Sequence, residues 1–436
     1  MVKKLTGNAM ILSMDQSAAL TDINKLLSDT GIREHVLTGS PGTGKSHLTT
    51  QVIVNAENAG YQVVLTATTH QATKVMADFT QREVLTMHKL FDLKIINNYV
   101  TGEISTDRSV GRHGPMIEQQ ANTNQPILLV IDEASFINAP LYSYIPEFLE
   151  TYSNIVVLYV GDADQLPPIG TPIPHVFNIN LPTSILTTDH RFSSTSQMAQ
   201  VVQKLKANIQ DKSYFLTEIV SGKEITVLDE DDFKDKMFEL YNTVDYQLDP
   251  YFVKTMAYRN TVVNNMNNHI RNYFYDNPSY QIGERLIVNT ALKRKTKMLA
   301  HNSDVVTVLD NTSTIYEGLK CQHLTLQNGK KKPFKAYYTV QKQKKNAYRK
   351  TLIENREWKK LYTFIDSFIE VKEPYSSTIH KAQGASYTNV MLHLDDLVAC
   401  DDLEILARLL LVAVSRAREH VYVYGGVPAN LLRKAG

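Results

Sequence analysis

The residues with the clearest chemistry occupy positions 39–46, where the sequence reads GSPGTGKS. An apolar run precedes this segment, and a helical pattern of apolar residues follows it at Leu48, Val52 and Ile53. The spacing G-x-x-x-x-G-K-S is that of a phosphate-binding loop, in which backbone N–H groups converge on phosphates at a helix N-terminus. Such a loop predicts binding of ATP and Mg²⁺, with the lysine reaching the β- and γ-phosphates and the serine binding the metal. The predicted residues are Gly39, Gly42, Thr43, Gly44, Lys45 and Ser46.

Two adjacent carboxylates, Asp132 and Glu133, follow an apolar run at 126–131. Such a run is typical of a buried parallel strand, and ligands bind beyond the carboxyl ends of these strands. Asp132 is therefore predicted to hold Mg²⁺, directly or through water, and Glu133 to orient and deprotonate the attacking water. Because acidic residues often simply end a strand, this interpretation depends on the phosphate-binding loop upstream.

A third apolar run, at 155–160, leads into residues 161–168, which read GDADQLPP. This segment resembles motif III of the superfamily 1 helicases, and other signatures of that family occur in the same order along almost the whole chain. The resemblance is to the 5′→3′ branch, which includes the RecD-like and phage Dda-type DNA helicases. It implies an α/β protein with two RecA-like P-loop motor domains, each a parallel sheet flanked by helices, that bind ATP between them.

The resemblance assigns further nucleotide contacts in the first half of the chain. A segment near the N-terminus resembles the family's Q motif, so Gln16 would read the adenine edge through its amide. Gln165 of motif III joins the catalytic set. Residues 186–193 resemble motif IV, which implies that Arg191 reaches the γ-phosphate and that His190 can stack on the adenine.

Two segments near the C-terminus complete the expected ATP site. Residues 377–386 resemble motif V, in which Gln383 and Gly384 would approach the nucleotide and coordinate the two sites. Residues 409–418 resemble motif VI and make Arg416 the candidate arginine finger, whose guanidinium would meet charge developing on the γ-phosphate.

The resemblance also implies contacts with single-stranded DNA. Residues 65–74 and 85–88 resemble motifs Ia and Ib, and motif V contributes to the same path. A histidine in motif Ib is equally consistent with a core or capping role when considered alone. The implied strand contacts are Thr69, His70, His88, Thr378 and His380.

Residues 95–104 fit a short hairpin inserted between motifs Ib and II. In Dda-type enzymes a pin at this place splits the duplex, with an aromatic residue near its tip. The resemblance therefore suggests Tyr99 as a pin residue that contacts nucleic acid. An exposed loop tyrosine is an equally good interpretation.

The formal net charge is only +1, from 46 Lys plus Arg and 45 Asp plus Glu, but the charge is unevenly distributed. Residues 281–372 hold 19 basic and 8 acidic residues, a net of +11, whereas residues 211–250 hold 4 and 11, a net of −7. Cations interleaved with aromatic rings suit a polyanion. Short apolar stretches separated by turn signals predict a small β-barrel in the basic segment, and the resemblance implies an SH3-like barrel there.

The length of 436 residues suits about three domains. The predicted division is 1–85 and 126–183 for the first motor domain, 86–125 for a pin insertion, 184–280 and 373–436 for the second motor domain, and 281–372 for the basic insertion.

The cysteine count and the apolar segments exclude other classes of protein. Cys321 and Cys400 make neither a disulfide framework nor a metal-binding pattern. No apolar segment has the length of a signal peptide or of a membrane span. These features predict a protein of a reducing compartment with no role at a membrane, and the resemblance to phage-encoded helicases implies the bacterial or phage-infected host cytoplasm.

Together these residues predict an ATP-dependent DNA helicase that moves 5′→3′ on single-stranded DNA and unwinds duplex DNA in replication, recombination or repair. Expected partners are single-stranded and forked duplex DNA, with single-strand-binding or replication proteins, and the chain is expected to act as a monomer. Two alternatives stay open. One is an RNA helicase or RNA–DNA remodeller with the same motor, and the other is a P-loop kinase or ATP-gated binding protein, which leaves motifs V and VI unexplained.

Overall fold

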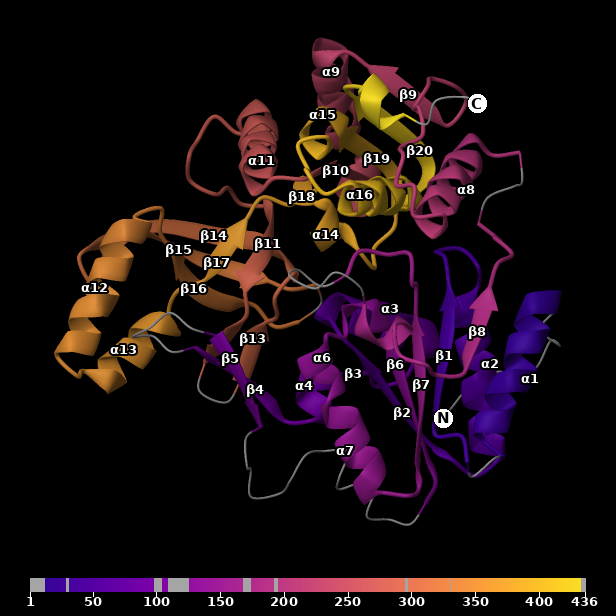
Figure 1. Cartoon of the computed structure of the whole chain (residues 1–436). Helices are drawn as coiled ribbons and strands as arrows, with labels where there is room; N and C mark the ends of the chain where they lie inside the picture. The colour runs from indigo at the N-terminus through magenta and orange to yellow at the C-terminus, as the bar shows by residue number, and fades with distance from the viewer. Residues whose placement is uncertain are drawn as a thin grey trace.

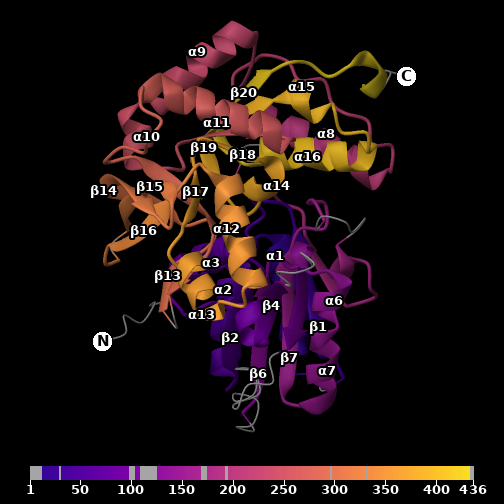
Figure 2. The same ribbon diagram turned by 90° about the vertical axis from the view of Figure 1, so that its left-hand side faces the viewer.

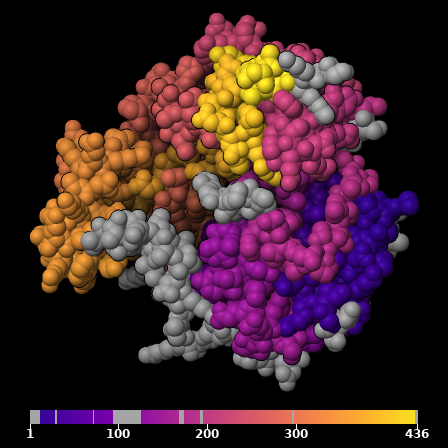
Figure 3. All heavy atoms as spheres, in the orientation of Figure 1, coloured from indigo at the N-terminus to yellow at the C-terminus, as the bar shows by residue number. Residues whose placement is uncertain are grey.

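The computed structural model describes residues 12–28, 31–97, 104–108, 125–167, 174–191, 195–294, 297–329 and 331–432. Figures 1 and 2 show two α/β bodies stacked one on the other, with a third body of antiparallel strands and two helices beside their junction. In space-filling view the first body, indigo to magenta, meets the second, rose to yellow, along a seam (Figure 3). Within the described ranges, no helix is both long and apolar enough to cross a membrane.

The first motor domain is built on a six-stranded parallel sheet in the order β3-β2-β6-β7-β1-β8. Both faces of the sheet are covered, as the unbroken apolar strands predict. In β6, Ile127, Leu129 and Ile131 pack toward α4 and α7, whereas Leu128 and Val130 pack toward α1, α2 and α3. The strands are β1 (Glu34–Gly39), β2 (Gln62–Ala67), β3 (Leu85–Thr86), β6 (Ile127–Asp132), β7 (Ile155–Gly161) and β8 (Thr183–Leu186). The helices are α1 (Met14–Leu26), α2 (Lys45–Asn58), α3 (His70–Thr80), α4 (Met87–Leu90), α6 (Ala139–Tyr142) and α7 (Tyr144–Thr151).

The second motor domain repeats this design with a five-stranded parallel sheet in the order β18-β10-β19-β20-β9. Val390 and Leu392 of β19 pack toward α8 and α16, and Met391 between them packs toward α9 and α11. The strands are β9 (Ile225–Leu228), β10 (Val253–Ala257), β18 (Ser376–Thr378), β19 (Tyr387–His393) and β20 (Ala417–Tyr424). The helices are α8 (Gln197–Gln210), α9 (Glu230–Tyr241), α10 (Val244–Leu248), α11 (Asn260–Phe274), α14 (Ile379–Ala382), α15 (Leu394–Leu397) and α16 (Leu403–Ser415).

The basic insertion forms an antiparallel sheet in the order β16-β15-β14-β11-β17. Its edge strands approach each other, because Tyr337 N donates to Ser367 O (2.8 Å) and Ile369 N donates to Tyr337 O (2.9 Å). The strands are β11 (Arg285–Thr290), β14 (Val305–Tyr316), β15 (Leu319–Gln327), β16 (Phe334–Tyr338) and β17 (Glu370–Lys372), with a separate pair β12 (Leu292–Arg294) and β13 (Lys297–Ala300). Two helices, α12 (Lys342–Glu354) and α13 (Trp358–Ile365), follow β16.

Two features of the fold correct the sequence-based expectations. Strand β8 pairs with β1 as far as Leu186, so the first motor domain extends past the predicted boundary at residue 183. The segment 281–372, for which the sequence predicted a small β-barrel, also contains the helices α12 and α13. They are held by tertiary packing, in which Leu352, Leu361 and Phe364 close a small core of their own against the sheet.

A two-stranded antiparallel hairpin follows α4. Strands β4 (Leu93–Asn97) and β5 (Ile104–Arg108) pair in the region where the sequence predicted a hairpin. Tyr99, the suggested pin residue, lies outside the described residues.

A buried ion pair joins the second motor domain to the insertion. Arg271 of α11 donates to Glu284, just before β11, through Nε (2.7 Å) and Nη2 (3.1 Å), and both side chains are buried. Arg271 also donates to the carbonyl oxygens of Asn277 and Ser279. The guanidinium of Arg271 thus holds the segment that leads from α11 into the insertion.

We expect Arg271→Met to lower the free energy of unfolding by about 3–5 kcal/mol, because it leaves the buried Glu284 carboxylate without its cationic partner. Denaturant unfolding of the purified protein measures the loss. The double variant Arg271→Met/Glu284→Leu should recover part of it, and an equal loss in both variants would contradict the ion-pair explanation.

Candidate active site and nucleic-acid groove

The phosphate-binding loop runs from the end of β1 to the start of α2, as its sequence predicts. Gly42 and Gly44 have φ angles of 96° and 82°, in the left-handed region. A Cβ on Gly42 would lie 2.6 Å from Oδ1 of Asp189, and one on Gly44 would lie 2.4 Å from Nε2 of Gln16. Both positions therefore need glycine, for conformation and for space.

Lys45 begins α2 and turns its ammonium into this loop. Nζ donates to the carbonyl oxygens of Gly39 (2.5 Å) and Ser40 (3.0 Å). Burial lowers the pKa of Lys45, while the nearby carboxylates of Asp162 and Glu133 oppose that shift. A cation held by loop carbonyls at this point is placed to bind phosphate oxygens.

Ser46 and Asp132 are the predicted magnesium ligands, and their surroundings fit that role. Ser46 is exposed on the first turn of α2, and Asp132 ends β6 with Oδ1 accepting the Glu133 N–H (2.9 Å). Burial raises the pKa of Asp132, an effect that a bound cation would offset. Mg²⁺ commonly keeps several waters and takes one or two protein ligands beside substrate phosphates, so one hydroxyl and one carboxylate suffice. The described part of the chain contains no cluster of three or more His, Cys, Asp or Glu suited to a metal.

Glu133 has the properties expected of a general base. Its backbone is left-handed (φ 53°, ψ 44°), and Thr68 Oγ1 donates to its carbonyl oxygen (3.1 Å). Burial, then the neighbouring charge of Asp132, raises the pKa of Glu133 to about 7. Its Oε1 lies 3.3 Å from where a Cβ on Gly384 would stand, so this carboxylate faces motif V of the other motor domain.

The two predicted arginines converge on Ser415 at the end of α16. Arg416 is buried, with Nη1 donating to Ala385 O (3.1 Å) and Nη2 to Ser415 Oγ (3.3 Å). Arg191 Nη1 donates to Ser415 O (2.9 Å). Burial lowers the pKa of Arg191, and the positive charge of Arg416 lowers it further, which places the two guanidiniums close together.

Three buried polar atoms in this region have no hydrogen-bond partner among the described residues: Oε1 of Gln165, Oε1 of Gln383 and Nε of Arg416. Buried polar groups are nearly always paired, so these atoms are available to a bound nucleotide or water. Gln165 belongs to the first motor domain and the other two belong to the second. The set fits a nucleotide and its attacking water between the domains.

The two residues predicted to bind adenine lie together beside the loop. Gln16 Nε2 donates to Thr43 O (3.1 Å) and lies 3.3 Å from Nε2 of His190. His190 N donates to Gly42 O (2.9 Å), and its ring is exposed, as a stacking surface must be. The amide of Gln16 also caps the start of α1, because its Oε1 accepts the Ser13 N–H (3.1 Å).

A groove of about 430 Å³ crosses both motor domains next to this site. Four of the residues predicted to contact the strand are among those that line it: Thr69, His70, His88 and His380. Burial lowers the pKa of each of the three histidines, so they are neutral near pH 7 and offer rings and hydrogen bonds in place of charge. His88, for which the sequence left a core or capping role open, lies on this groove.

Thr378 is placed differently from Thr69 and the histidines. Its side chain is buried and outside the groove lining, and its hydroxyl accepts the Lys381 N–H (3.4 Å) at the start of α14. Thr378 thus caps the short helix that carries His380 and Lys381, and its direct contact with the strand stays a prediction.

The structure adds site residues that the sequence did not indicate. The loop before β14 reaches the groove, where Asn302 and Ser303 line it and the ring of His301 lies 4.6 Å from that of His70. Nothing in the sequence of this loop indicates the contact. Arg408 donates to Ala163 O (3.0 Å) and Gln165 O (3.3 Å) across the domain seam, and its signal in the sequence is an arginine inside an otherwise apolar stretch of α16.

Two family models match the chain: the AAA domain at residues 28–171 and the UvrD-like helicase C-terminal domain at residues 374–424. The chain is also 22% identical over 433 residues to the ATP-dependent DNA helicase dda of Enterobacteria phage T4, covering 89% of this chain and 94% of that protein. By these matches the chain is similar to the superfamily 1 DNA helicases of the 5′→3′ branch.

Other comparisons place this helicase among relatives of different length. It is 30% identical over 216 residues to the ATP-dependent RecD2 DNA helicase of Deinococcus radiodurans, a match that covers 48% of this helicase but only 26% of RecD2. The crystal structure of Pif1 helicase from Candida albicans superposes with a TM-score of 0.51 at 16% identity, covering 97% of this chain and 96% of that one. The Pif1 likeness concerns the fold.

We expect the ATPase rate of the helicase to rise between pH 6 and pH 8, because Glu133, with a pKa of about 7, must lose its proton to act as a base. Steady-state rates at saturating ATP and DNA measure this profile. Glu133→Gln should lower the rate at least about 100-fold at every pH. A wild-type rate that is flat over this range would contradict the assignment.

Proposed function

We propose that this helicase hydrolyses ATP to move 5′→3′ along single-stranded DNA and so unwinds duplex DNA. The observation that carries the proposal is the position of residues 380–384. His380 and Gln383 line the groove, while Gly384 lies against the Glu133 carboxylate. One short segment therefore touches both the strand site and the ATP site, as coupling between them requires.

The chemistry proposed for the ATP site divides among residues of both motor domains. Glu133 accepts a proton from the attacking water, and Gln165, with its unpaired Oε1, orients that water. Lys45, Arg191 and Arg416 bring positive charge to the phosphates. Mg²⁺, when held by Ser46 and Asp132, would neutralise charge on the phosphate oxygens.

Movement is proposed to follow from contacts that span the seam between the domains. Gln383 Nε2 donates to Leu166 O (3.3 Å), and Arg408 donates to Ala163 O. A nucleotide bound from both sides favours the closed seam, and hydrolysis removes that preference. The groove residues of α3 and of α14 then move relative to each other, so the strand is gripped by each domain in turn.

We further propose that the insertion is an SH3-like barrel and that it binds the phosphates of nucleic acid without sequence preference. Support comes from its net positive charge and from the backbone bonds that bring β16 next to the segment before β17. Lys293, Arg294, Lys331 and Lys332 are exposed on it. Replacing these four residues by Gln should make the dependence of DNA affinity on salt less steep. The slope of log Kd against log salt should fall by roughly 0.7 for each phosphate that is no longer neutralised by a cation. An unchanged slope of log Kd against log salt would refute the role.

The proposed substrate and polarity are tested on purified protein. Single-stranded DNA should stimulate the ATPase more than single-stranded RNA does, and a preference for RNA would favour an RNA helicase or RNA–DNA remodeller. Strand displacement should occur on partial duplexes with a 5′ tail and fail on those with only a 3′ tail. Lys45→Ala should abolish turnover in every assay, because the variant has no ammonium for the β- and γ-phosphates. No stimulation by either polymer would reject the proposal.

The proposed partners follow from the same geometry. Single-stranded DNA would occupy the groove, and forked duplex DNA would meet the β4–β5 hairpin, where we place strand separation. Both halves of the ATP site come from one chain, which supports action as a monomer.

A further inference from the structure

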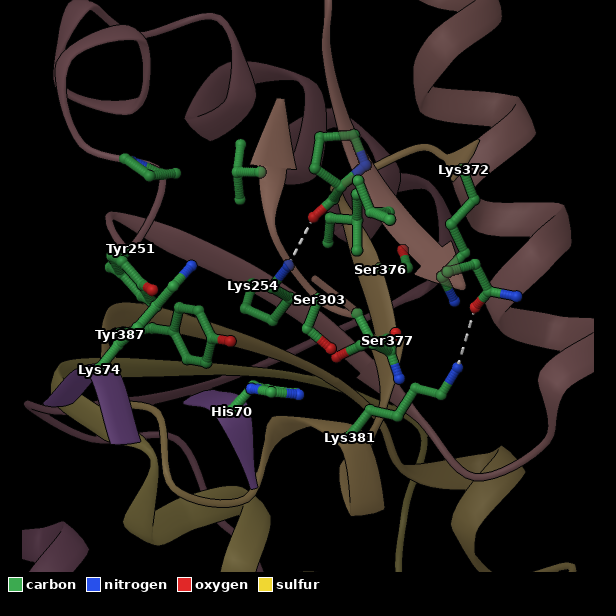
Figure 4. Close-up of a pocket in the computed structure, with 17 residues that line it drawn as sticks. His70, Lys74, Tyr251, Lys254, Ser303, Lys372, Ser376, Ser377, Lys381 and Tyr387 are labelled. Atoms are coloured by element: carbon green, nitrogen blue, oxygen red, sulfur yellow. Dashed lines mark hydrogen bonds between the residues drawn. The ribbon is translucent and has the colours of Figure 1, made fainter. Parts of the chain in front are cut away.

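A second cavity, of about 100 Å³, lies where the three parts of the helicase meet (Figure 4). Its walls come from α3 of the first motor domain, from β10 and β18 of the second, and from β11 and the loop before β14 in the insertion. It shares His70, Asn302, Ser303 and Lys381 with the groove, so the two spaces adjoin. None of the residues placed in the catalytic set lines it.

The lining of this cavity is strongly basic. It includes Lys74, Lys254, Lys372 and Lys381, each from a different element, and no aspartate or glutamate among the described residues. Lys74 is paired with Asp304, which lies behind the lining. Within the described part of the chain, no carboxylate forms an ion pair with the other three lysines, and Figure 4 shows their side chains around one space.

Lys254 is the most unusual of these lysines, because it lies in a β-strand and its side chain is buried. Nζ donates to the carbonyl oxygen of Pro374, and the ammonium lies 5.6 Å from the centre of the Tyr387 ring. Burial, then the charge of Lys372, lowers the pKa of Lys254 to about 7. Burying a cation without a counter-charge is costly, so an anion in the cavity would stabilise the charged form of Lys254.

Two serines supply further donors to the same space. Ser376 and Ser377 line the cavity, are 1% and 8% exposed, and have hydroxyl oxygens without a hydrogen-bond partner among the described residues. A hydroxyl can rotate to donate to a neighbouring oxyanion. Two such hydroxyls beside a buried ammonium are the donor set of a small, multiply charged oxyanion.

We infer that this cavity binds one phosphate group of the nucleic-acid strand, held by Lys254, Ser376 and Ser377. The inference rests on the proposed function, because the strand must occupy the adjoining groove. A free phosphate ion has the same chemistry, but His70, Ser303 and Lys381 line both spaces, and this favours a phosphate belonging to a strand in the groove. A phosphate here would be contacted by both motor domains and by the insertion.

The test uses single-stranded oligonucleotides in which one phosphate at a time is replaced by a neutral methylphosphonate. Wild-type protein should lose about tenfold in affinity at the phosphate that enters the cavity, the loss typical of a charge-assisted hydrogen bond. Lys254→Met should weaken binding of the unmodified strand about tenfold and show no further loss at that position. Ser377→Ala, a smaller change, should weaken binding about threefold.

Lys223→Met provides a control for the removal of a charge, since Lys223 is exposed beside β9, at the opposite edge of the second sheet from β18. It should keep the wild-type profile across all modified strands. If Lys254→Met and Ser377→Ala also keep that profile, the inferred site is wrong. If neither DNA nor RNA strands stimulate the ATPase of the wild-type protein, the proposed function is rejected. The strand is then also rejected as the ligand of the cavity.

Inorganic phosphate separates the two sources of the group. Titrated into wild-type protein, it should compete with the strand, and Lys254→Met should remove that competition. Phosphate that binds through Lys254 while the strand stays bound with unchanged affinity would show a free-ion site and overturn the assignment to the strand.

Discussion

The architecture of this helicase depends on the balance between a few buried charges around the expected position of the γ-phosphate. These positive and negative side chains come from both motor domains. Lys45 and Glu133 come from the first motor domain, and Arg416 comes from the second. Burial lowers the pKa of Lys45 and Arg416 and raises that of Glu133, and the opposite charges counter each shift. The attraction between Arg416 and Glu133 acts across the seam between the domains. The pKa values of these two groups therefore depend on the spacing between the domains.

The contacts across the seam leave this balance free to respond to a ligand. Gln383 and Arg408 of the second motor domain donate to backbone carbonyl oxygens of the first. These bonds hold the domains in register and leave Oε1 of Gln383 without a partner among the described residues. The unpaired Oε1 atoms of Gln165 and Gln383 therefore remain available to a nucleotide.

The sequence predicted those parts of the site that depend on local spacing. The phosphate-binding loop needs its glycines within one turn, and Asp132 and Glu133 need only a strand end, so both motifs can be recognised in a short window. The fold class was also predictable, because unbroken apolar strands require helices on both faces. The contact of His70 with His301 was not predictable, since the two residues are far apart in sequence and the loop carries no motif.

Other differences have the same origin in tertiary structure. The capping bond of the Thr378 hydroxyl was not predicted, because it depends on the short α14 that begins directly after this residue. Helices α12 and α13 have many charged residues and a narrow apolar stripe, and their stability comes from packing on β15 and the Tyr337 ring. The end of the first domain was set by strand pairing, which no residue between Thr183 and Leu186 indicates.

The insertion is attached unequally to the two motor domains, and this affects how the strand is held. Its link to the second domain is the buried, two-bond pair of Arg271 and Glu284, which is costly to break. Its link to the first is the pair of Lys74 and Asp304, in which the lysine side chain is 53% exposed and the carboxylate is buried. Asp304 also accepts hydrogen bonds from the His301 N–H and from Asn328 within the insertion. Because the Arg271 guanidinium is withdrawn from water and the Lys74 ammonium is not, we expect the insertion to stay with the second domain if the seam opens or closes. In the proposed mechanism Asn302 and Ser303 would then keep their place beside α14, and the second domain would contact the strand from two sides.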